Sequence, residues 1–141
     1  MIRAFIKEQD LKEVMTIWLK TNIETHEFID ASYWHQNYKM VEEILPEAEI
    51  YVWEEDKKIK GFIGLQDGYI AGLFINKENQ GQGIGKKLLE KAKELYDRLE
   101  LSVYQKNTRG VAFYKREEFE VSKKQEDEQT RELEYYMKWY K

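Results

Sequence analysis

The stretch Gln80-Gly81-Gln82-Gly83-Ile84-Gly85 limits the possible folds of this chain more than any other. It contains three of the eight glycines and lies between an apolar run that ends at Ile75 and a helix-like run that starts at Lys86. Glycines at alternate positions permit positive φ and remove Cβ atoms from one side, so successive backbone N–H groups can converge. The next helix adds unpaired N–H groups and a partial positive charge at its N-terminus. The stretch therefore predicts a strand-to-helix turn that binds phosphate.

Residue spacing separates three kinds of glycine-rich phosphate motif. A P-loop needs glycine at the position of Gln80 and Ser or Thr at the position of Lys87, so the P-loop is excluded. The dinucleotide-binding fingerprint needs its third glycine where this chain has Lys86, and it is excluded too. The pattern Gln/Arg-x-x-Gly-x-Gly/Ala does match, at Gln80, Gly83 and Gly85. The alternative is a turn that merely allows close packing of a helix on a strand.

Length and composition indicate one globular domain over residues 1–141. Hydrophobic residues make up 42% of the chain and charged residues 35%, and 141 residues suffice for a single core. A net charge of -4 argues against a general nucleic-acid or anionic-membrane surface. With no cysteine and two histidines, neither a disulfide framework nor a zinc site is expected.

The sequence lacks the features of membrane and exported proteins. No apolar run approaches the roughly 20 residues of a membrane span. The first residues run directly into a charged segment rather than into the apolar core of a signal peptide. A cytoplasmic location is expected.

Hydrophobic periodicity predicts a mixed α+β chain with a mostly antiparallel sheet flanked by helices. Strands are expected over residues 2–6, 50–53, 59–65, 69–75, 101–104, 119–122 and 133–140. Helical spacing covers residues 11–19, 34–45, 86–99 and 111–114. Asp10 with Glu13 resembles a capping box at the first helix, and Asp30 or Ser32 is expected to cap the second. Asp67-Gly68 predicts a hairpin turn.

A second motif lies about twenty residues after the glycine turn. The segment from Asn107 to Phe119, NTRGVAFYKREEF, resembles the Asn-x-x-Ala-x-x-Phe-Tyr-x-x-x-Gly-Phe stretch of the GNAT N-acetyltransferases. The glycine turn resembles the pyrophosphate-binding turn of the same family, and the two motifs occur in the family's order. Two positions depart from the pattern: Gly110 replaces alanine, and Glu118 replaces the glycine before Phe119.

The resemblance implies the GNAT acyl-CoA N-acyltransferase fold, with acetyl-CoA bound where the strand before the glycine turn separates from the next strand. It implies that the pantetheine arm follows that strand and contacts Asn107, while the turn holds the pyrophosphate. The implied cofactor-binding residues are Leu73, Phe74, Ile75, Gln80, Gly81, Gln82, Gly83, Ile84, Gly85, Lys86 and Asn107. Lys86, Lys87 and Arg109 are candidate contacts to nucleotide phosphates or, equally, ordinary surface charges.

The resemblance also implies a general acid at Tyr114. A phenol of pKa ~10 is protonated at neutral pH and can protonate a departing thiolate. Many members of the family carry a glutamate on the strand before the turn, but residues 69–75 contain no carboxylate. His26 and Glu27, between the first two helices, are therefore candidates for the base or for acceptor binding, and His35 is a weaker one.

The predicted activity is transfer of an acetyl group from acetyl-CoA to a primary amine of a small molecule or peptide, by direct attack in a ternary complex. Glu27, Asp30, Tyr33 and Trp34 are candidates for an acidic, aromatic mouth for a cationic amine. The protein is expected to be a monomer or homodimer and to need no metal. Because the strand carboxylate is missing, one alternative is a non-catalytic acyl-CoA-binding module. Another is an interaction protein that retains only the scaffold.

Overall fold

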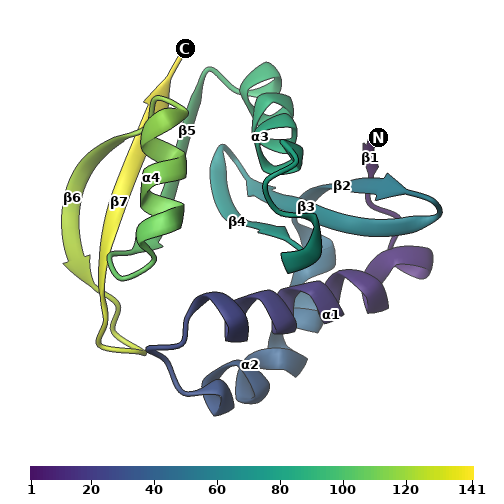
Figure 1. Ribbon diagram of the computed structural model, residues 1–141, viewed down its shortest axis with the longest axis horizontal. Helices are drawn as coiled ribbons and strands as arrows, with labels where there is room; N and C mark the ends of the chain where they lie inside the picture. Colours follow the sequence, from purple (N-terminus) through teal and green to yellow (C-terminus); the bar gives the residue numbers. More distant parts are fainter.

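The computed structural model describes residues 1–141 and contains one seven-stranded sheet with four α-helices (Figure 1). The strands are β1 (Ile2–Ala4), β2 (Glu49–Glu55), β3 (Lys58–Gln66), β4 (Tyr69–Ile75), β5 (Arg98–Tyr104), β6 (Glu120–Glu126) and β7 (Leu133–Tyr140). The helices are α1 (Lys7–Thr25), α2 (Ala31–Ile44), α3 (Ile84–Leu95) and α4 (Thr108–Arg116), with short 3-10 turns η1 (Leu45–Glu47) and η2 (Lys77–Asn79). The predicted α+β class is confirmed.

The sheet separates between its two central strands. Its order is β1-β2-β3-β4-β5-β7-β6, and every neighbouring pair is antiparallel except β4 with β5. These two parallel strands are paired through Tyr69 and Glu100 alone, and they diverge beyond that point (Figure 1). The later residues of β4 therefore present their outer backbone edge to a space rather than to a strand.

A β-bulge lies in β4 next to this separation. Gly64 of β3 faces Gly72, whereas the next residue, Leu65, faces Ile70, so Ala71 has no partner on β3. A bulge of this kind bends its strand and increases the local twist. The bulge thus accounts for the direction in which β4 leaves β5.

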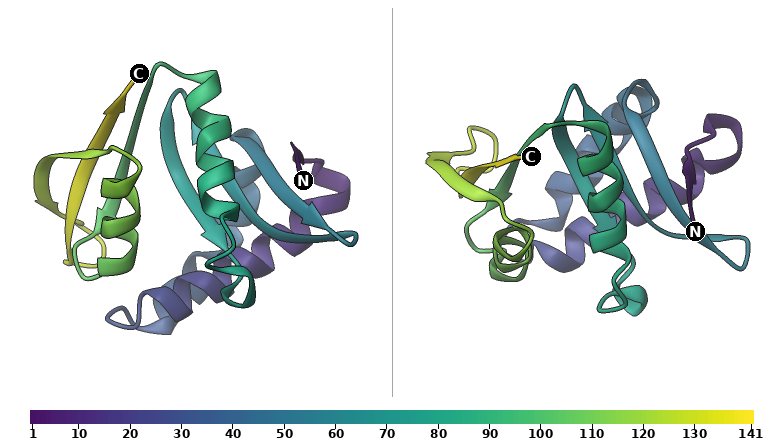
Figure 2. Two further views of the ribbon diagram at one scale, coloured as in Figure 1. Left: turned by 45° about the horizontal axis from the view of Figure 1, so that its top comes forward. Right: turned by 90° about the horizontal axis from the view of Figure 1, so that it is seen from above.

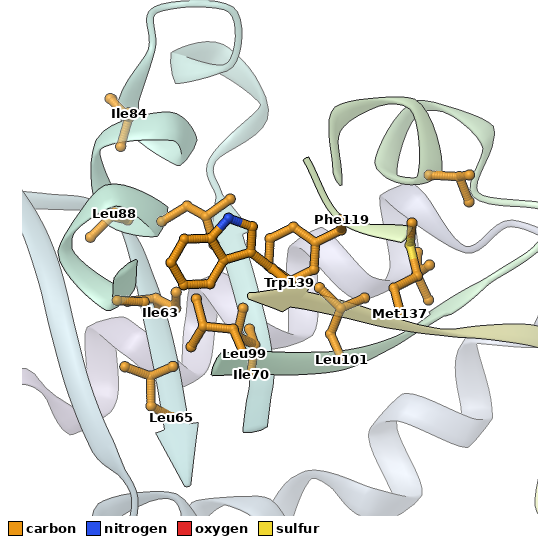
Figure 3. Packing of buried hydrophobic residues seen from close by; sticks show 14 residues of the cluster. Ile63, Leu65, Ile70, Ile84, Leu88, Leu99, Leu101, Phe119, Met137 and Trp139 are labelled. Atoms are coloured by element: carbon orange, nitrogen blue, oxygen red, sulfur yellow. The ribbon is translucent and has the colours of Figure 1, made fainter. Parts of the chain in front are cut away.

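The two faces of the sheet are covered by different helix pairs. Adjacent residues of a strand point to opposite faces: Phe62 packs in a cluster with residues of α1 and α2, and Ile63 packs in one with residues of α3 and α4. In Figure 2, α1 and α2 lie on one side of the sheet and α3 lies on the other. In the second cluster, Leu99 and Leu101 of β5 meet Phe119 and Met137 (Figure 3). Packing on both sides fixes the elements that surround the separation.

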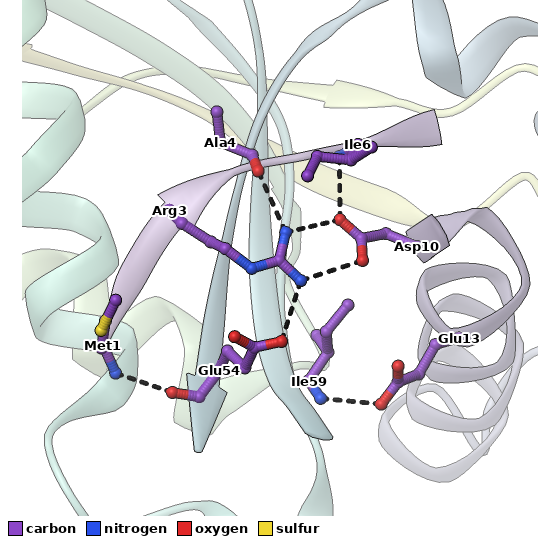
Figure 4. Close-up of polar contacts among 8 residues, drawn as sticks. All are labelled: Met1, Arg3, Ala4, Ile6, Asp10, Glu13, Glu54 and Ile59. Carbon is purple, nitrogen blue, oxygen red and sulfur yellow. Dashed lines mark hydrogen bonds and ion pairs between the residues drawn. The ribbon is translucent and has the colours of Figure 1, made fainter. Parts of the chain in front are cut away.

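The predicted capping box at the first helix is wrong. Helix α1 begins at Lys7, with Ile6 at the N-cap and no side-chain cap. The Asp10 carboxylate accepts hydrogen bonds from the Ile6 N–H at 2.8 Å and from two Arg3 nitrogens at 2.7 and 2.9 Å (Figure 4). Glu13 accepts a hydrogen bond from the Ile59 N–H at 2.7 Å. Both carboxylates therefore fasten α1 to the sheet, Asp10 through Arg3 of β1 and Glu13 through Ile59 of β3.

Arg3 holds the pKa of the Asp10 carboxyl below its ordinary value, chiefly through their hydrogen bonds. Arg3 also contacts Glu54 at 3.0 Å, so the guanidinium joins β1, α1 and β2. The corresponding prediction for α2 is confirmed: the Asp30 side chain caps this helix by accepting a hydrogen bond from the Ser32 N–H at 2.9 Å.

Several boundaries differ from the sequence prediction, among them the end of α1 at Thr25 instead of near residue 19. Helix α3 ends at Leu95 rather than near Leu99, because Tyr96 is already extended and Leu99 follows the alternating burial of β5. Strand β6 continues to Glu126, through residues predicted to form a loop. The Asp67-Gly68 turn is confirmed, with φ of 50° and 85°. No helix combines the length and the apolar character that crossing a membrane would demand.

Candidate active site

The glycine turn leaves an open surface before α3. Gly81 and Gly83 have φ of 81° and 82°, in the left-handed region that glycine tolerates best. Gly83 is the N-cap of α3. A Cβ atom at either position would meet no heavy atom within 4 Å. Backbone conformation therefore favours glycine at both positions, and the space beside their Cα atoms is free for a ligand.

The Gln80 side chain connects the end of β4 with the start of α4. Its side-chain nitrogen donates a hydrogen bond to the Ile75 carbonyl at 3.0 Å, and its side-chain oxygen accepts one from Arg109 at 2.8 Å. The end of β4 and the first turn of α4 are thus held together across the turn.

A cleft of about 1020 Å³ follows the separation of β4 from β5. Its lining includes the predicted residues His26, Leu73, Phe74, Ile75, Gln80, Gly81, Gly83, Ile84, Gly85, Lys86, Asn107 and Tyr114. Gln82 and Glu27 do not line it. Lys87 lies over the Trp53 ring, 5.2 Å from its centroid, instead of facing the cleft. The structure thus brings most of the predicted site residues together.

The two departures from the second motif have local explanations. Asn107 caps α4 by accepting a hydrogen bond from the Gly110 N–H at 3.0 Å. A Cβ at position 110 would lie 2.5 Å from the Asn107 side-chain nitrogen, so glycine makes room for this side-chain conformation. Glu118 takes the place of glycine at a φ of 74°. The bend before Phe119 is therefore made by a non-glycine residue in the left-handed region.

Tyr114 lines the cleft from α4. Its ring packs against Phe113 and Phe119, with centroids 5.2 and 5.5 Å away. Burial raises the pKa of the Tyr114 phenol above its ordinary value. The hydroxyl is therefore protonated throughout the neutral range.

His26 sits in an aromatic cluster. Its ring stacks on Trp34 with centroids 5.4 Å apart. The Tyr104 and Phe28 rings make T-shaped contacts with it, with centroids 5.1 and 5.6 Å away. Burial lowers its pKa to about 4, and its Nδ1 has no hydrogen-bond partner. His26 is consequently neutral at pH 7 and a weak proton acceptor.

The predicted acidic, aromatic mouth is only partly formed. Trp34 is buried in the core, and the Tyr33 hydroxyl donates a hydrogen bond to Gln129 at 2.6 Å. Glu27 and Asp30 are exposed. Trp34 therefore offers no exposed ring face for a cation.

Sequence reasoning missed Glu24. It lines the cleft from the last turn of α1, together with Thr21 and Thr25. Positions i, i+3 and i+4 share one helix face. Because helical spacing predicted the first helix only over residues 11–19, this polar stripe was not recognised. The signal that could have identified Glu24 is its spacing of three residues from Thr21, which places both on one face of a helix that continues to Thr25.

A family sequence model described as "Acetyltransferase (GNAT) domain" matches residues 19–138. The chain belongs to the GNAT acetyltransferase family. The chain is 30% identical over 135 residues to a peptidyl-lysine N-acetyltransferase, YiaC, of Escherichia coli, covering 94% of this chain and 92% of that protein. It is 33% identical to the peptidyl-lysine N-acetyltransferase YjaB of Salmonella typhimurium, covering 85% and 83%.

Solved structures of GNAT proteins have the same fold. The solution structure of apo YjaB from Escherichia coli aligns with a TM-score of 0.86 at 28% identity, over 99% of this chain and 96% of that one. The PaiA N-acetyltransferase of Thermoplasma acidophilum, crystallised with coenzyme A, aligns with a TM-score of 0.84 at 19% identity, over 100% and 98%.

Membership of this family confirms the predicted class of reaction, acetyl transfer from acetyl-CoA to an amine. The residues present fit this donor, because the glycine turn is open and the β4 edge is unpaired beyond Tyr69. No three His, Cys, Asp or Glu side chains gather as a potential metal site.

Proposed function

We propose that this protein acetylates the ε-amino group of lysine side chains in peptides or proteins. The observation that carries the proposal is a single cleft that runs from an open phosphate turn to the C-terminal turn of α1, where Glu24 supplies a carboxylate. The names of the two relatives, both peptidyl-lysine N-acetyltransferases, support the choice of acceptor over a small-molecule amine.

The cofactor-binding roles are part of this proposal. We expect backbone N–H groups from Gln82 to Lys86 to bind the pyrophosphate, together with the positive end of the α3 dipole. We expect the free β4 edge at Leu73–Ile75 to form hydrogen bonds with the amide groups of the pantetheine arm. Asn107 uses its side-chain oxygen to cap α4, so its side-chain nitrogen is the group left to donate a hydrogen bond to that arm.

Acetyl-CoA supplies the acetyl group as a thioester. In this proposal a backbone N–H at Leu73 or Phe74 stabilises negative charge on the carbonyl oxygen as the amine attacks. Tyr114, on the opposite wall of the cleft, is to give its proton to the sulfur as the C–S bond breaks. His26 is neutral and enclosed, so we assign it to the wall of the acceptor end rather than to proton transfer.

The test combines binding with turnover. Acetyl-CoA at concentrations far above its Kd should raise the melting temperature. Thiol release should then be measured with a lysine-containing peptide, with the same peptide carrying an ε-acetylated lysine, and with small amines. Release with the free-lysine peptide alone supports the proposal, whereas release only with small amines would contradict it. The single domain over residues 1–141, the cytoplasmic location and the monomer or homodimer stay predictions.

A further inference from the structure

The cleft contains one carboxylate without a partner. Among its lining residues only Glu24 and Glu117 are acidic. Glu117 lies 3.6 Å from the Lys93 ammonium group. The Glu24 side chain makes no hydrogen bond or ion pair, and its Oε1 is buried without a partner. Glu24 is therefore the one acidic group of the cleft that is left to bind a cation.

An unpaired buried carboxylate oxygen is costly, because it loses water and gains no donor in return. Such groups in a native protein require an explanation, and a ligand that supplies the missing donors is one. The cations that line the cleft do not supply them. Arg109 donates to Gln80, and Lys106 contacts Glu132 at 3.1 Å.

The position of Glu24 suits an acceptor that approaches from outside the cofactor site. Glu24 also lines a groove of about 650 Å³ between α1 and α2, and it is the one residue common to this groove and the cleft. Leu19, Ile23 and Tyr38 give the groove an apolar surface. A lysine side chain has the matching character, with an apolar stem and a cationic end.

The other candidate groups do not compete with Glu24. The residues of β4 include no carboxylate. His26 is uncharged at pH 7 because of its burial, so it has no negative charge with which to bind an ammonium group. Glu27 lies outside the cleft.

We infer that Glu24 binds the ε-ammonium group of the acceptor lysine and accepts its first proton, an assignment that rests on the proposed function. Glu24 then passes that proton to water. The nitrogen forms a bond to the acetyl carbon while the bond from that carbon to sulfur breaks, and Tyr114 protonates the sulfur. The second proton lost by the nitrogen returns to the Tyr114 oxygen. One proton is thus released to water for each acetyl group transferred.

The test is Glu24→Gln, which keeps size and removes the charge. With a lysine peptide, kcat/KM should fall about 10²-fold or more, while the Kd for acetyl-CoA stays the same. The melting temperature should not fall, because the change removes an unpaired charge from a partly buried position. Transfer to hydroxylamine, which is uncharged at neutral pH, should be largely retained. Glu24→Asp should recover part of the activity with the peptide. Glu8→Gln, an exposed change in the first turn of the same helix, is the matched control.

Two outcomes overturn the inference: unchanged kcat/KM for the lysine peptide in Glu24→Gln, or an equal loss with lysine peptide and hydroxylamine. The wild-type protein separates this failure from failure of the proposed function. If the wild type releases no thiol with lysine peptides, the acceptor is wrong. If the wild type is active and Glu24→Gln equals it, only the role of Glu24 is wrong.

Discussion

The Gln80 side chain accepts a hydrogen bond from Arg109 at 2.8 Å and so joins the glycine turn to the first turn of α4. Gln80 also binds the Ile75 carbonyl, at the end of β4. Two motifs that are separate in the sequence are therefore one structural unit around the cleft.

Gln80→Ala should weaken acetyl-CoA binding about tenfold, because two hydrogen bonds of roughly 1 kcal/mol each no longer hold the turn. Isothermal titration calorimetry measures the Kd. Gln66→Ala, at the exposed end of β3, is the control and should bind like the wild type. An unaltered Kd for Gln80→Ala would mean that the turn keeps its conformation without this side chain.

Gly83→Val should abolish acetyl-CoA binding while the domain still folds. A side chain at φ of 82° costs roughly 1–2 kcal/mol, but its Cβ atom meets no heavy atom within 4 Å and the side chain starts toward the space proposed for phosphate. Thermal unfolding and calorimetry measure the two effects separately. Gly83→Ala should show the same strain with a smaller loss of affinity. Normal affinity in the valine variant would make the turn purely structural.

Tyr114→Phe should lower kcat by about 10²-fold, within the range of one positioned acid, and leave the Kd for acetyl-CoA unchanged. The ring and its contacts with Phe113 and Phe119 are kept, and only the proton donor is lost. Steady-state kinetics and calorimetry give the comparison. Tyr140→Phe, at an exposed tyrosine, is the control. Full activity of Tyr114→Phe would make Tyr114 a wall of the cleft.

Glu118→Gly should stabilise the protein by about 1 kcal/mol, since glycine tolerates the φ of 74° that glutamate adopts there. The melting temperature should rise by roughly 3–5 °C for a domain of this size. Lys124 is an exposed residue of strand β6 without a positive φ, so Lys124→Gly should lower the melting temperature instead. A lower melting temperature for Glu118→Gly would show that the glutamate side chain has contacts that outweigh the strain.

His26 should make the protein sensitive to mild acid. Its pKa is about 4 in the folded protein against 6.5 for the ordinary group, so the unfolded chain binds the proton more readily. The contribution of His26 to stability is thus complete above pH 6.5 and is lost as the pH falls toward 4, by about 3 kcal/mol in all. His26→Phe should remove this part of the pH dependence in chemical denaturation measured from pH 7 to 4. Parallel curves for the two proteins would contradict it.

Local patterns predicted the parts of the fold that depend on local chemistry. Strand β4 spans Tyr69–Ile75 as expected, because its apolar run ends at Ile75 and polar residues follow from Asn76 to Gln80. Asp30 caps α2, and the Asp67-Gly68 turn forms, for similarly local reasons.

The errors came from contacts that the local pattern does not show. The residues Asp10 and Glu13 fit a capping box, but α1 already begins at Lys7, Asp10 binds Arg3 of β1, and Glu13 binds Ile59 of β3. Glu24 was missed because helical propensity alone does not show that α1 continues to Thr25. Its unpaired oxygen is a property of the packed cleft and has no signature in the sequence.

The β4 edge beyond Tyr69 has a further consequence for solubility. An unpaired strand edge usually offers a template on which a strand of another molecule can add, and this leads to aggregation. Here the edge lies inside the cleft, between Thr21 of α1 and Phe113 of α4. We expect these walls to obstruct a polypeptide strand with side chains on both faces, whereas a narrow chain that carries amide groups, as proposed for the cofactor, would fit. On this proposal the recessed edge admits a thin ligand and disfavours self-association through the same strand.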